Sequence, residues 1–370
     1  MKMKLHEQVI QGVVHPIHLS EPVIHADNEK RRRSGHMGHG MTEFAPGKVM
    51  AFSANTSAVN GDGHVHYGWM EYAISEDYGN TFGDPVPLPY AVESFLDGLY
   101  TISVEKAITM DNGNIAAFCL QNRNTDDTRL PRWGCPTVVI SEDQGKTWKD
   151  AVRVTGYPGR IWDVIYRDGV VYILEYCNPT GSMGEKPEHL YRLFKSEDNC
   201  ENFEEISVIP FDTLGRTYGN MIFTPEGDLI VYAYNKDSEE EMDYIISHDN
   251  GESWDEPGVC FLKKKIRNPQ IGYLDGQYIC TGRAGEIGPR FTYGAFVLYT
   301  SADGIHWDDG KILVTGRTCC FYSENLTLTL PDGSTKMLLK YSENYDDHKP
   351  GDGSGRVNSM MLQITTCKDA

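Results

Sequence analysis

Short hydrophobic runs recur along the whole chain, and tight-turn dipeptides separate them. Strand-like runs such as KVMAF, DLIVY and KMLLKY flank the turns, and helical periodicity is absent. The six turns are Pro46-Gly47, Asn112-Gly113, Asp168-Gly169, Glu226-Gly227, Asp275-Gly276 and Asp332-Gly333. Turns of this kind join antiparallel strands into hairpins. The pattern therefore predicts six hairpin units, whose glycines are 49 to 66 residues apart.

A second turn motif alternates with these hairpins. Its clear copies read Ser-x-Asp-x-Gly-x-Thr/Ser-aromatic and begin at Ser75, Ser141 and Ser247, while weaker copies begin at Ser196 and Ser301. Aspartate and serine side chains bond the N–H groups of tight turns, and glycine adopts positive φ there. Because the same chemistry recurs in successive units, we interpret these aspartates as structural rather than catalytic.

Repeated units of about 60 residues, each long enough for four short strands, are typical of β-propellers. The sequence therefore predicts an all-β fold, a six-bladed β-propeller of four-stranded antiparallel sheets, formed by residues 1–370 as a single domain. The last strand-like run, around residues 357–364, follows the sixth unit. We expect this run to share a blade with the N-terminal segment and so to close the ring.

The charge balance of the chain excludes several kinds of partner. Its 370 residues include 53 Asp and Glu against 34 Lys and Arg, which gives a net charge of −19. Such an acidic chain is poorly suited to nucleic acid or to an anionic membrane surface. No apolar run could span a bilayer and no signal peptide is visible, so we expect a cytoplasmic protein unless an export signal has been cleaved. The nine cysteines include no C-x-x-C pair, which argues against a structural zinc site, and we expect no cofactor.

Candidate site residues follow from the geometry of a propeller, in which the innermost strand of each blade lies along a central channel. Here that strand should precede each hairpin glycine, and its far end should reach the channel mouth. Counting back about ten residues from each glycine gives His36 and His39, Glu105, Arg160 and Trp162, Arg216 and Tyr218, Arg267, and finally Tyr322 and Glu324. Arginines recur in three successive blades. Converging guanidinium groups favour an anion between them, and their planar fork suits a carboxylate or a sulfate.

The repeated Ser-x-Asp-x-Gly-x-Thr-Trp motif resembles the Asp-box, or BNR repeat, of the sialidase superfamily of six-bladed propellers. The resemblance extends over nearly the whole chain and implies a hydrolase that removes a terminal acidic sugar. The stretch FYSENLTLTLPDG looks like the sialidase segment that carries the nucleophilic tyrosine, so Tyr322 is the implied nucleophile. By the same resemblance, Asp62 is the acid/base and Arg290 is the third arginine that binds the sugar carboxylate.

Other positions depart from the sialidase pattern. Met37-Gly38-His39 stands where the first arginine is expected, Tyr234 stands at the second, and residues 218–220 replace the glutamate of blade 4. We regard Arg160, Arg216, Arg267 and Arg283 as candidates to compensate from other blades.

The base that activates Tyr322 stays open among Glu324, Glu105 and Glu175. A phenol with a pKa near 10 needs such a base at neutral pH. His36 and His39, together with His64 and His66, are candidate proton shuttles. Their H-x-H and H-x-x-H spacings also permit a metal, and structural roles are equally open, so we assign no metal site.

Three functions fit these observations. The favoured one is the sialidase-like hydrolase. The second is a uronate lyase, in which arginine or histidine neutralises a carboxylate while a histidine or Tyr322 moves protons. The third is a glycan-binding propeller without catalysis, in which aromatic side chains such as Trp162 and Tyr218 stack on sugars. All three imply a small acidic glycan as the partner, and neither nucleic acid nor a membrane.

Overall fold

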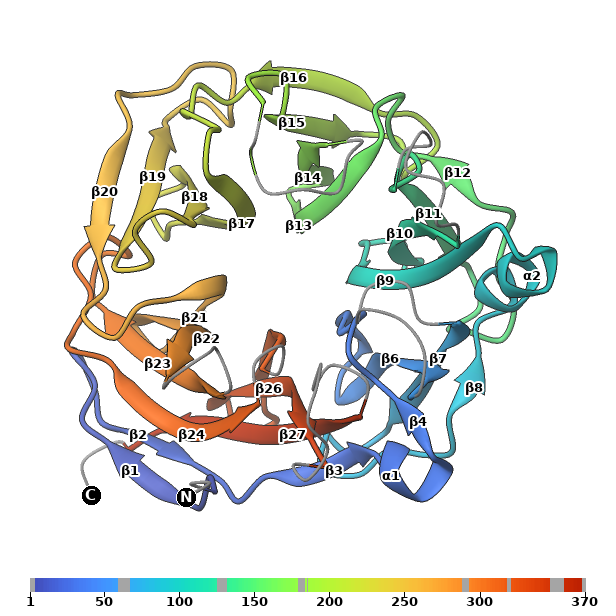
Figure 1. The fold of residues 1–370 in the computed structure, drawn as a ribbon, viewed down its shortest axis with the longest axis horizontal. Helices are drawn as coiled ribbons and strands as arrows, with labels where there is room; N and C mark the ends of the chain where they lie inside the picture. The colour runs from blue at the N-terminus through green and yellow to red at the C-terminus, as the bar shows by residue number, and fades with distance from the viewer. Residues whose placement is uncertain are drawn as a thin grey trace.

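The computed structural model describes residues 4–58, 67–124, 132–178, 184, 186–287, 293–317, 321–346 and 356–367. Six antiparallel sheets stand around a common axis like the blades of a propeller (Figure 1). The all-β, six-bladed fold predicted from the repeats is therefore confirmed.

Each blade follows the chain outward from the axis. The innermost strands of blades 1 to 6 are β5 (Met41–Ala45), β9 (Tyr100–Thr109), β13 (Gly159–Arg167), β17 (Arg216–Phe223), β21 (Arg267–Leu274) and β25 (Ser323–Thr329). The second strands are β6 (Lys48–Ser57), β10 (Ile115–Arg123), β14 (Val170–Cys177), β18 (Leu229–Asn235), β22 (Gln277–Ile287) and β26 (Thr335–Asn344). The third strands are β7 (Gly68–Ser75), β11 (Thr137–Ser141), β15 (Leu190–Ser196), β19 (Glu241–Ser247), β23 (Tyr293–Ser301) and β27 (Val357–Thr366). The outer strands of blades 1 to 5 are β8 (Val86–Pro87), β12 (Val152–Arg153), β16 (Glu204–Val208), β20 (Gly258–Phe261) and β24 (Lys311–Arg317).

The N-terminal segment completes blade 6. Strand β2 (Ile17–Leu19) pairs with β27, and β1 (Gln8–Ile10) pairs with β2. Strand β3 (Val23–Ala26) also pairs with β27, whereas β4 (Arg33–Ser34) already belongs to blade 1, where it pairs with β6. The pairing expected between the last strand and the N-terminal segment is therefore present. Each inner strand contacts the next around the axis, and β25 contacts β5, so the ring is closed.

A separate apolar cluster fills each interface between neighbouring blades. Blades 1 and 2 meet through Phe52 and Val104, for example, and blades 6 and 1 meet through Leu338 and Val49. Such face-to-face packing requires apolar side chains on both faces of a sheet, which explains the continuous burial of strands such as β18.

The repeated Ser-x-Asp turns connect the third and outer strands and hold neighbouring blades together. In the second copy, Ser141 Oγ accepts a hydrogen bond from Gly145 N (2.7 Å), and Asp143 Oδ1 accepts one from Thr147 N (2.8 Å). The hydrogen bonds from Thr147 lower the pKa of Asp143 to about 2. Tyr72 of blade 1 donates to the carbonyl of Gly145 in blade 2 (2.6 Å). The geometry supports the structural interpretation of these aspartates.

Among the described residues, two short helices interrupt the strands, which the absence of helical periodicity did not anticipate. Helix α1 (Asn28–Arg31) follows β3, and α2 (Pro89–Asp97) joins blades 1 and 2. Helix α2 starts with proline and ends at Gly98 in the left-handed region (φ 75°), which are ordinary helix start and stop signals. Its nine residues are too few to show a clear period.

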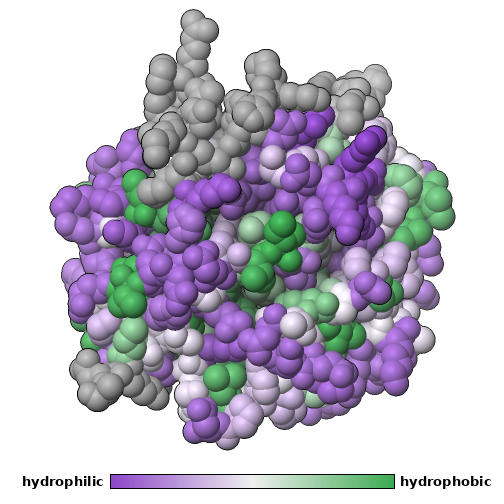
Figure 2. All heavy atoms as spheres, turned by 90° about the horizontal axis from the view of Figure 1, so that it is seen from below, coloured by the Kyte–Doolittle hydropathy of each residue, from purple (hydrophilic) through white to green (hydrophobic). Residues whose placement is uncertain are grey.

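The outer edge around blade 6 is mostly hydrophilic, with separate hydrophobic spots (Figure 2). In the described part of the chain, no helix has the length and apolar character needed to cross a membrane.

Candidate functional site

Side chains from five blades form a floor at one mouth of the axial channel. It is lined by Met37, Gly38, His39, Glu105, Lys106, Arg160, Trp162, Asn268, Gln270, Tyr322, Ser323 and Glu324. These residues enclose about 30 Å³, roughly the volume that one water molecule occupies in the liquid. They therefore form the base of a site rather than a complete sugar pocket. Blade 4 joins them through Tyr218, which contacts Tyr322.

β-Bulges shape this floor. The inner strands of blades 2 to 5 each carry a register irregularity near the mouth: Glu105 is the extra residue of β9, Trp162 that of β13, and β17 and β21 shift just after Arg216 and Arg267. A bulge breaks the alternation of a strand and redirects its side chains. Glu105 and its neighbour Lys106 consequently both line the floor.

Tyr322 is buried at the centre of an aromatic and cationic group. Its hydroxyl lies 3.2 Å from the hydroxyl of Tyr218. The His36 ring packs edge-on against the Tyr322 ring at 4.8 Å, and the Arg283 guanidinium lies 5.2 Å from the centre of that ring. The structure thus brings together four of the residues predicted from sequence.

Arg267 and Arg283 form the arginine pair at the mouth. They are cross-strand partners on β21 and β22, so their like charges face each other. Arg267 Nε lies 3.7 Å from Glu239 Oε1, and that carboxylate also accepts a hydrogen bond from Tyr234 (2.7 Å). Two adjacent guanidinium groups favour an anion between them.

The other two arginines predicted to converge there do not join this pair. Arg160 donates to Glu105 Oε2 (2.5 Å) and lies over the ring of Trp162 at 4.2 Å, so it remains part of the floor. Arg216 turns away from the axis, and its Nε contacts Asp243 Oδ2 at 2.7 Å on the third strand of its own blade. The expected convergence of Arg160, Arg216 and Arg267 is therefore not observed, because each guanidinium has a carboxylate within its own blade or the preceding one.

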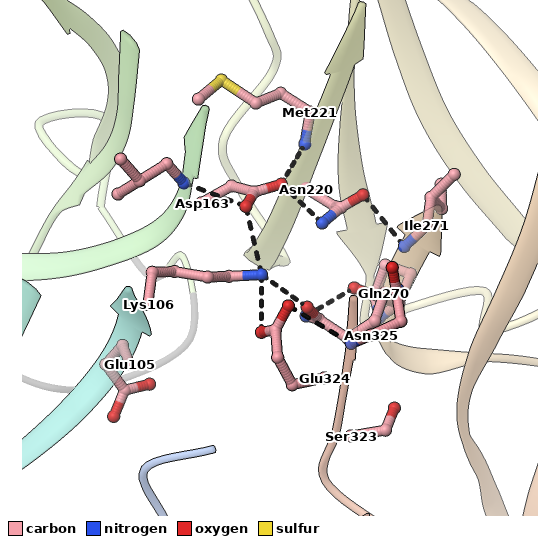
Figure 3. Close-up of polar contacts among 12 residues, drawn as sticks. Glu105, Lys106, Asp163, Asn220, Met221, Gln270, Ile271, Ser323, Glu324 and Asn325 are labelled. Carbon is pink, nitrogen blue, oxygen red and sulfur yellow. Dashed lines mark hydrogen bonds and ion pairs between the residues drawn. The ribbon is translucent and has the colours of Figure 1, made fainter. Parts of the chain in front are cut away.

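Lys106, Gln270 and Glu324 of the floor belong to a buried polar network that crosses the channel, and sequence analysis did not anticipate it (Figure 3). The Lys106 ammonium contacts Asp163 Oδ1 (3.1 Å) and Glu324 Oε2 (2.7 Å), and it donates to Gln270 Oε1 (2.8 Å). Asn220 donates to Asp163 Oδ2 (2.6 Å). Residues of this network also line a hollow of about 430 Å³ on the opposite side, so the network separates the mouth from the rest of the channel.

The three candidate bases for Tyr322 differ in their surroundings. Glu324 faces Lys106, and burial, partly offset by that lysine, raises the pKa of its carboxyl to about 7. Glu105 lines the floor and pairs with Arg160. Glu175 is buried in blade 3, where Thr155 donates to it (3.0 Å), and burial raises its pKa to about 8. Glu175 does not line the floor.

The environment of His39 argues against its predicted role as a proton shuttle. Its Nε2 lies 3.1 Å from the carbonyl oxygen of His36. Burial lowers the pKa of His39 to about 3, so its imidazole stays neutral near pH 7. A group that does not titrate near the working pH is a poor general acid or base.

Two residues implied by the sialidase resemblance, Asp62 and Arg290, lie outside the described residues, as do His64 and His66. Among the residues that the structure describes, no group of three or more His, Cys, Asp or Glu side chains is placed to hold a metal ion.

Comparison with known proteins identifies the fold. No family model and no curated protein matches the sequence. Among solved structures, a Dyadobacter fermentans protein of unknown function is similar at a TM-score of 0.70 and 14% identity, over 95% of this chain and 99% of that one. The Hadza microbial sialidase Hz136 is similar at 0.65 and 12%, over 94% and 68% of the two chains. A Trypanosoma rangeli sialidase is similar at 0.60 and 13%, over 98% of this chain and 59% of that one. The chain therefore has the six-bladed propeller fold of the sialidases.

Proposed function

We propose that the protein is a sialidase-like glycoside hydrolase that removes a terminal acidic sugar at this channel mouth, with Tyr322 as the nucleophile. One observation carries the proposal. The phenol of Tyr322 lies buried at the axis, in contact with the Tyr218 hydroxyl and beside the Arg283 guanidinium. A phenol and an arginine pair in one place suit a sugar that bears a carboxylate.

The proposed reaction has two steps. The sugar carboxylate binds to Arg267 and Arg283. In the first step Tyr322 gives its phenolic proton to a carboxylate of the floor, Glu105 or Glu324, and its oxygen attacks the anomeric carbon while the bond to the leaving oxygen breaks. Asp62, carried over from the resemblance, gives its proton to that leaving oxygen. In the second step Asp62 accepts a proton from a water molecule that attacks the same carbon, the bond between the sugar and the Tyr322 oxygen breaks, and Tyr322 takes back its proton. The positive Arg283 favours the phenolate that must form on Tyr322. A tyrosine nucleophile is a known exception among glycosidases, which otherwise use a carboxylate.

A second candidate is a uronate lyase, and the contact between Tyr218 and Tyr322 favours it. Tyr218 occupies the region where the sialidase resemblance calls for a glutamate, so a Tyr–Tyr pair replaces the expected Tyr–Glu pair. In this reaction the Tyr322 phenolate takes the proton next to the sugar carboxylate. The adjacent carbon–oxygen bond then breaks and a carbon–carbon double bond forms. The leaving oxygen takes up a proton from the Tyr218 hydroxyl, and Tyr322 passes the proton that it took to Tyr218.

A panel of sialylated, uronate-containing and neutral oligosaccharides tests the proposal. Tyr322→Phe should abolish turnover of an acidic glycan. The matched control is Tyr232→Phe, which removes another buried phenol. The Tyr232 hydroxyl donates to the Gly304 carbonyl oxygen (3.0 Å) and does not line the mouth. Release of a saturated reducing sugar supports hydrolysis, whereas a product with the ultraviolet absorbance of an unsaturated uronide supports the lyase. Undiminished turnover by Tyr322→Phe would contradict the role of Tyr322 in both reactions. Binding without turnover across the panel would contradict both enzyme assignments.

A further inference from the structure

A groove on blade 2 extends outward from the channel mouth. It has a volume of about 440 Å³, and its lining includes Tyr90, Tyr100, Gln121, Arg123, Trp133 and Arg153. We propose that this groove binds a second acidic sugar unit, so that the substrate is an acidic oligosaccharide with neighbouring anionic sugars. This inference rests on the proposed function, because it places the terminal sugar over Tyr322.

The groove and the mouth share one face of the ring. Tyr100 begins β9 and is the cross-strand partner of Arg123, the last residue of β10. Arg153 ends β12 and pairs with Thr137 at the start of β11. Because these strands are antiparallel, all four residues lie at the same edge of blade 2. That edge is the one from which β9 enters the floor of the mouth.

Trp133 connects the groove with the floor. Its side chain lines the groove, and the Arg160 guanidinium, which lines the floor, lies 5.5 Å from the centre of its ring. Trp133 is buried, with 5% of its surface exposed. Its ring is therefore a fixed wall that the groove and the Arg160 side of the floor share.

The chemistry of the groove suits an anionic sugar. Tyr90 and Tyr100 line the groove with aromatic rings, and aromatic rings suit the apolar faces of sugars. Arg123 donates to the Tyr100 hydroxyl (2.8 Å) and lies over that ring at 4.9 Å, which fixes its guanidinium at the groove. Arg153 is exposed and forms no ion pair with the described residues.

The net charge of the protein strengthens this interpretation. A chain of net charge −19 repels anions in general, so two arginines gathered in one groove beside the mouth create a local exception. Guanidinium groups bind carboxylate and sulfate through paired hydrogen bonds. A uronate unit and a sulfated unit share this chemistry, and the experiment separates them.

The test measures binding by calorimetry to Tyr322→Phe protein, which keeps ligands intact. The probes are galacturonate monomer, dimer and tetramer, a sulfated chondroitin tetramer, and a neutral cellotetraose. Arg153→Gln is compared with Lys149→Gln, a charge-matched change at an exposed residue of blade 2 that pairs with Glu142 (2.5 Å). Turnover of the same probes by the protein with Tyr322 intact is measured in parallel.

We expect at least one acidic tetramer to bind more tightly than the monomer. Arg153→Gln should lower the affinity for that tetramer about tenfold or more, because one charge-assisted contact is lost. The affinity for the monomer should stay unchanged. Lys149→Gln should change neither. Tighter binding of the galacturonate tetramer would identify the second unit as a uronate, and tighter binding of the chondroitin tetramer would identify it as a sulfated sugar.

Equal affinity for monomer and tetramers, or equal losses in the two variants, would overturn the second subsite even if acidic sugars are hydrolysed. Conversely, length-dependent binding that Arg153→Gln abolishes, together with no turnover of these probes or of the sialylated oligosaccharides, would support the groove and refute the proposed reaction. Absence of binding to every acidic probe would overturn the second subsite, and turnover of the sialylated oligosaccharides would then decide the proposed reaction separately.

Discussion

Replacement of Lys106 by methionine is the sharpest test of how the buried polar network across the channel is stabilised. The side chain keeps its length and apolar stem but loses the ammonium group. That group is buried and contacts Asp163 (3.1 Å), Glu324 (2.7 Å) and Gln270 (2.8 Å). Without it, two buried carboxylates face each other with no cation between them.

The magnitude follows from this geometry. Removal of one partner from a buried ion pair costs about 3–5 kcal/mol, since the remaining charge stays desolvated. Lys149→Met removes the cation of an exposed pair with Glu142 and should cost at most about 1 kcal/mol. The assay is urea denaturation of both variants. The loss in free energy of unfolding is taken from the shift in the urea midpoint, provided that the m-value does not change.

The pH dependence gives a second readout. Burial raises the pKa of Glu324 from 4.5 to about 7, so between these values the folded protein holds a proton that the unfolded chain has lost. This group therefore favours the folded state at pH 5 and ceases to do so as the pH rises through about 7. Loss of Lys106 should raise that pKa further. The stability deficit of Lys106→Met should then be smaller at about pH 5 than at about pH 8, and Glu324→Gln in the same chain should recover part of it.

Two results would refute this account of the network. One is a deficit for Lys106→Met no larger than that for Lys149→Met. The other is a deficit that does not change with pH, because the buried carboxyl could then not be the group left unpaired.

Three further predictions follow from the turns and the mouth. Gly113→Ala should lower the free energy of unfolding by about 1 kcal/mol, because Gly113 has a positive φ but open space around it. Gly79→Ala should lower it at least about twice as much in chemical denaturation, since the added Cβ would also collide with buried Leu338. Equal losses in the two variants would contradict this packing. His39→Gln should leave the pH profile of turnover unchanged between about pH 5 and 8, because burial lowers the pKa of this histidine to about 3; a shifted profile would restore the proton shuttle. Arg283→Gln should raise KM for an acidic glycan about tenfold or more, and an unchanged KM would remove it from the carboxylate site.

The sequence predicted the ring because turn chemistry is local. Hairpin glycines such as Gly113 and turn serines such as Ser141 mark the ends of strands wherever they occur, and the number of hairpin glycines equals the number of blades. Helix α2 was missed because a single nine-residue helix leaves no repeat to detect.

The mouth was predicted in part, and bulges explain most of the difference. Counting back from the turns found Tyr322 and Arg160, which line the floor. A bulge at Glu105 brings Lys106 to the floor as well, although strict alternation would place these neighbours on opposite faces. The direction of a long side chain is also set by its partners, as the contact of Arg216 with Asp243 illustrates. Neither feature has a local signature in the sequence.

A crystal structure of Tyr322→Phe with a bound acidic oligosaccharide tests the central claim most directly. The account predicts the ring of the terminal sugar over residue 322, with its carboxylate on Arg267 and Arg283. A sugar bound at the outer edge of the blades, or one whose carboxylate faces away from both arginines, would contradict it.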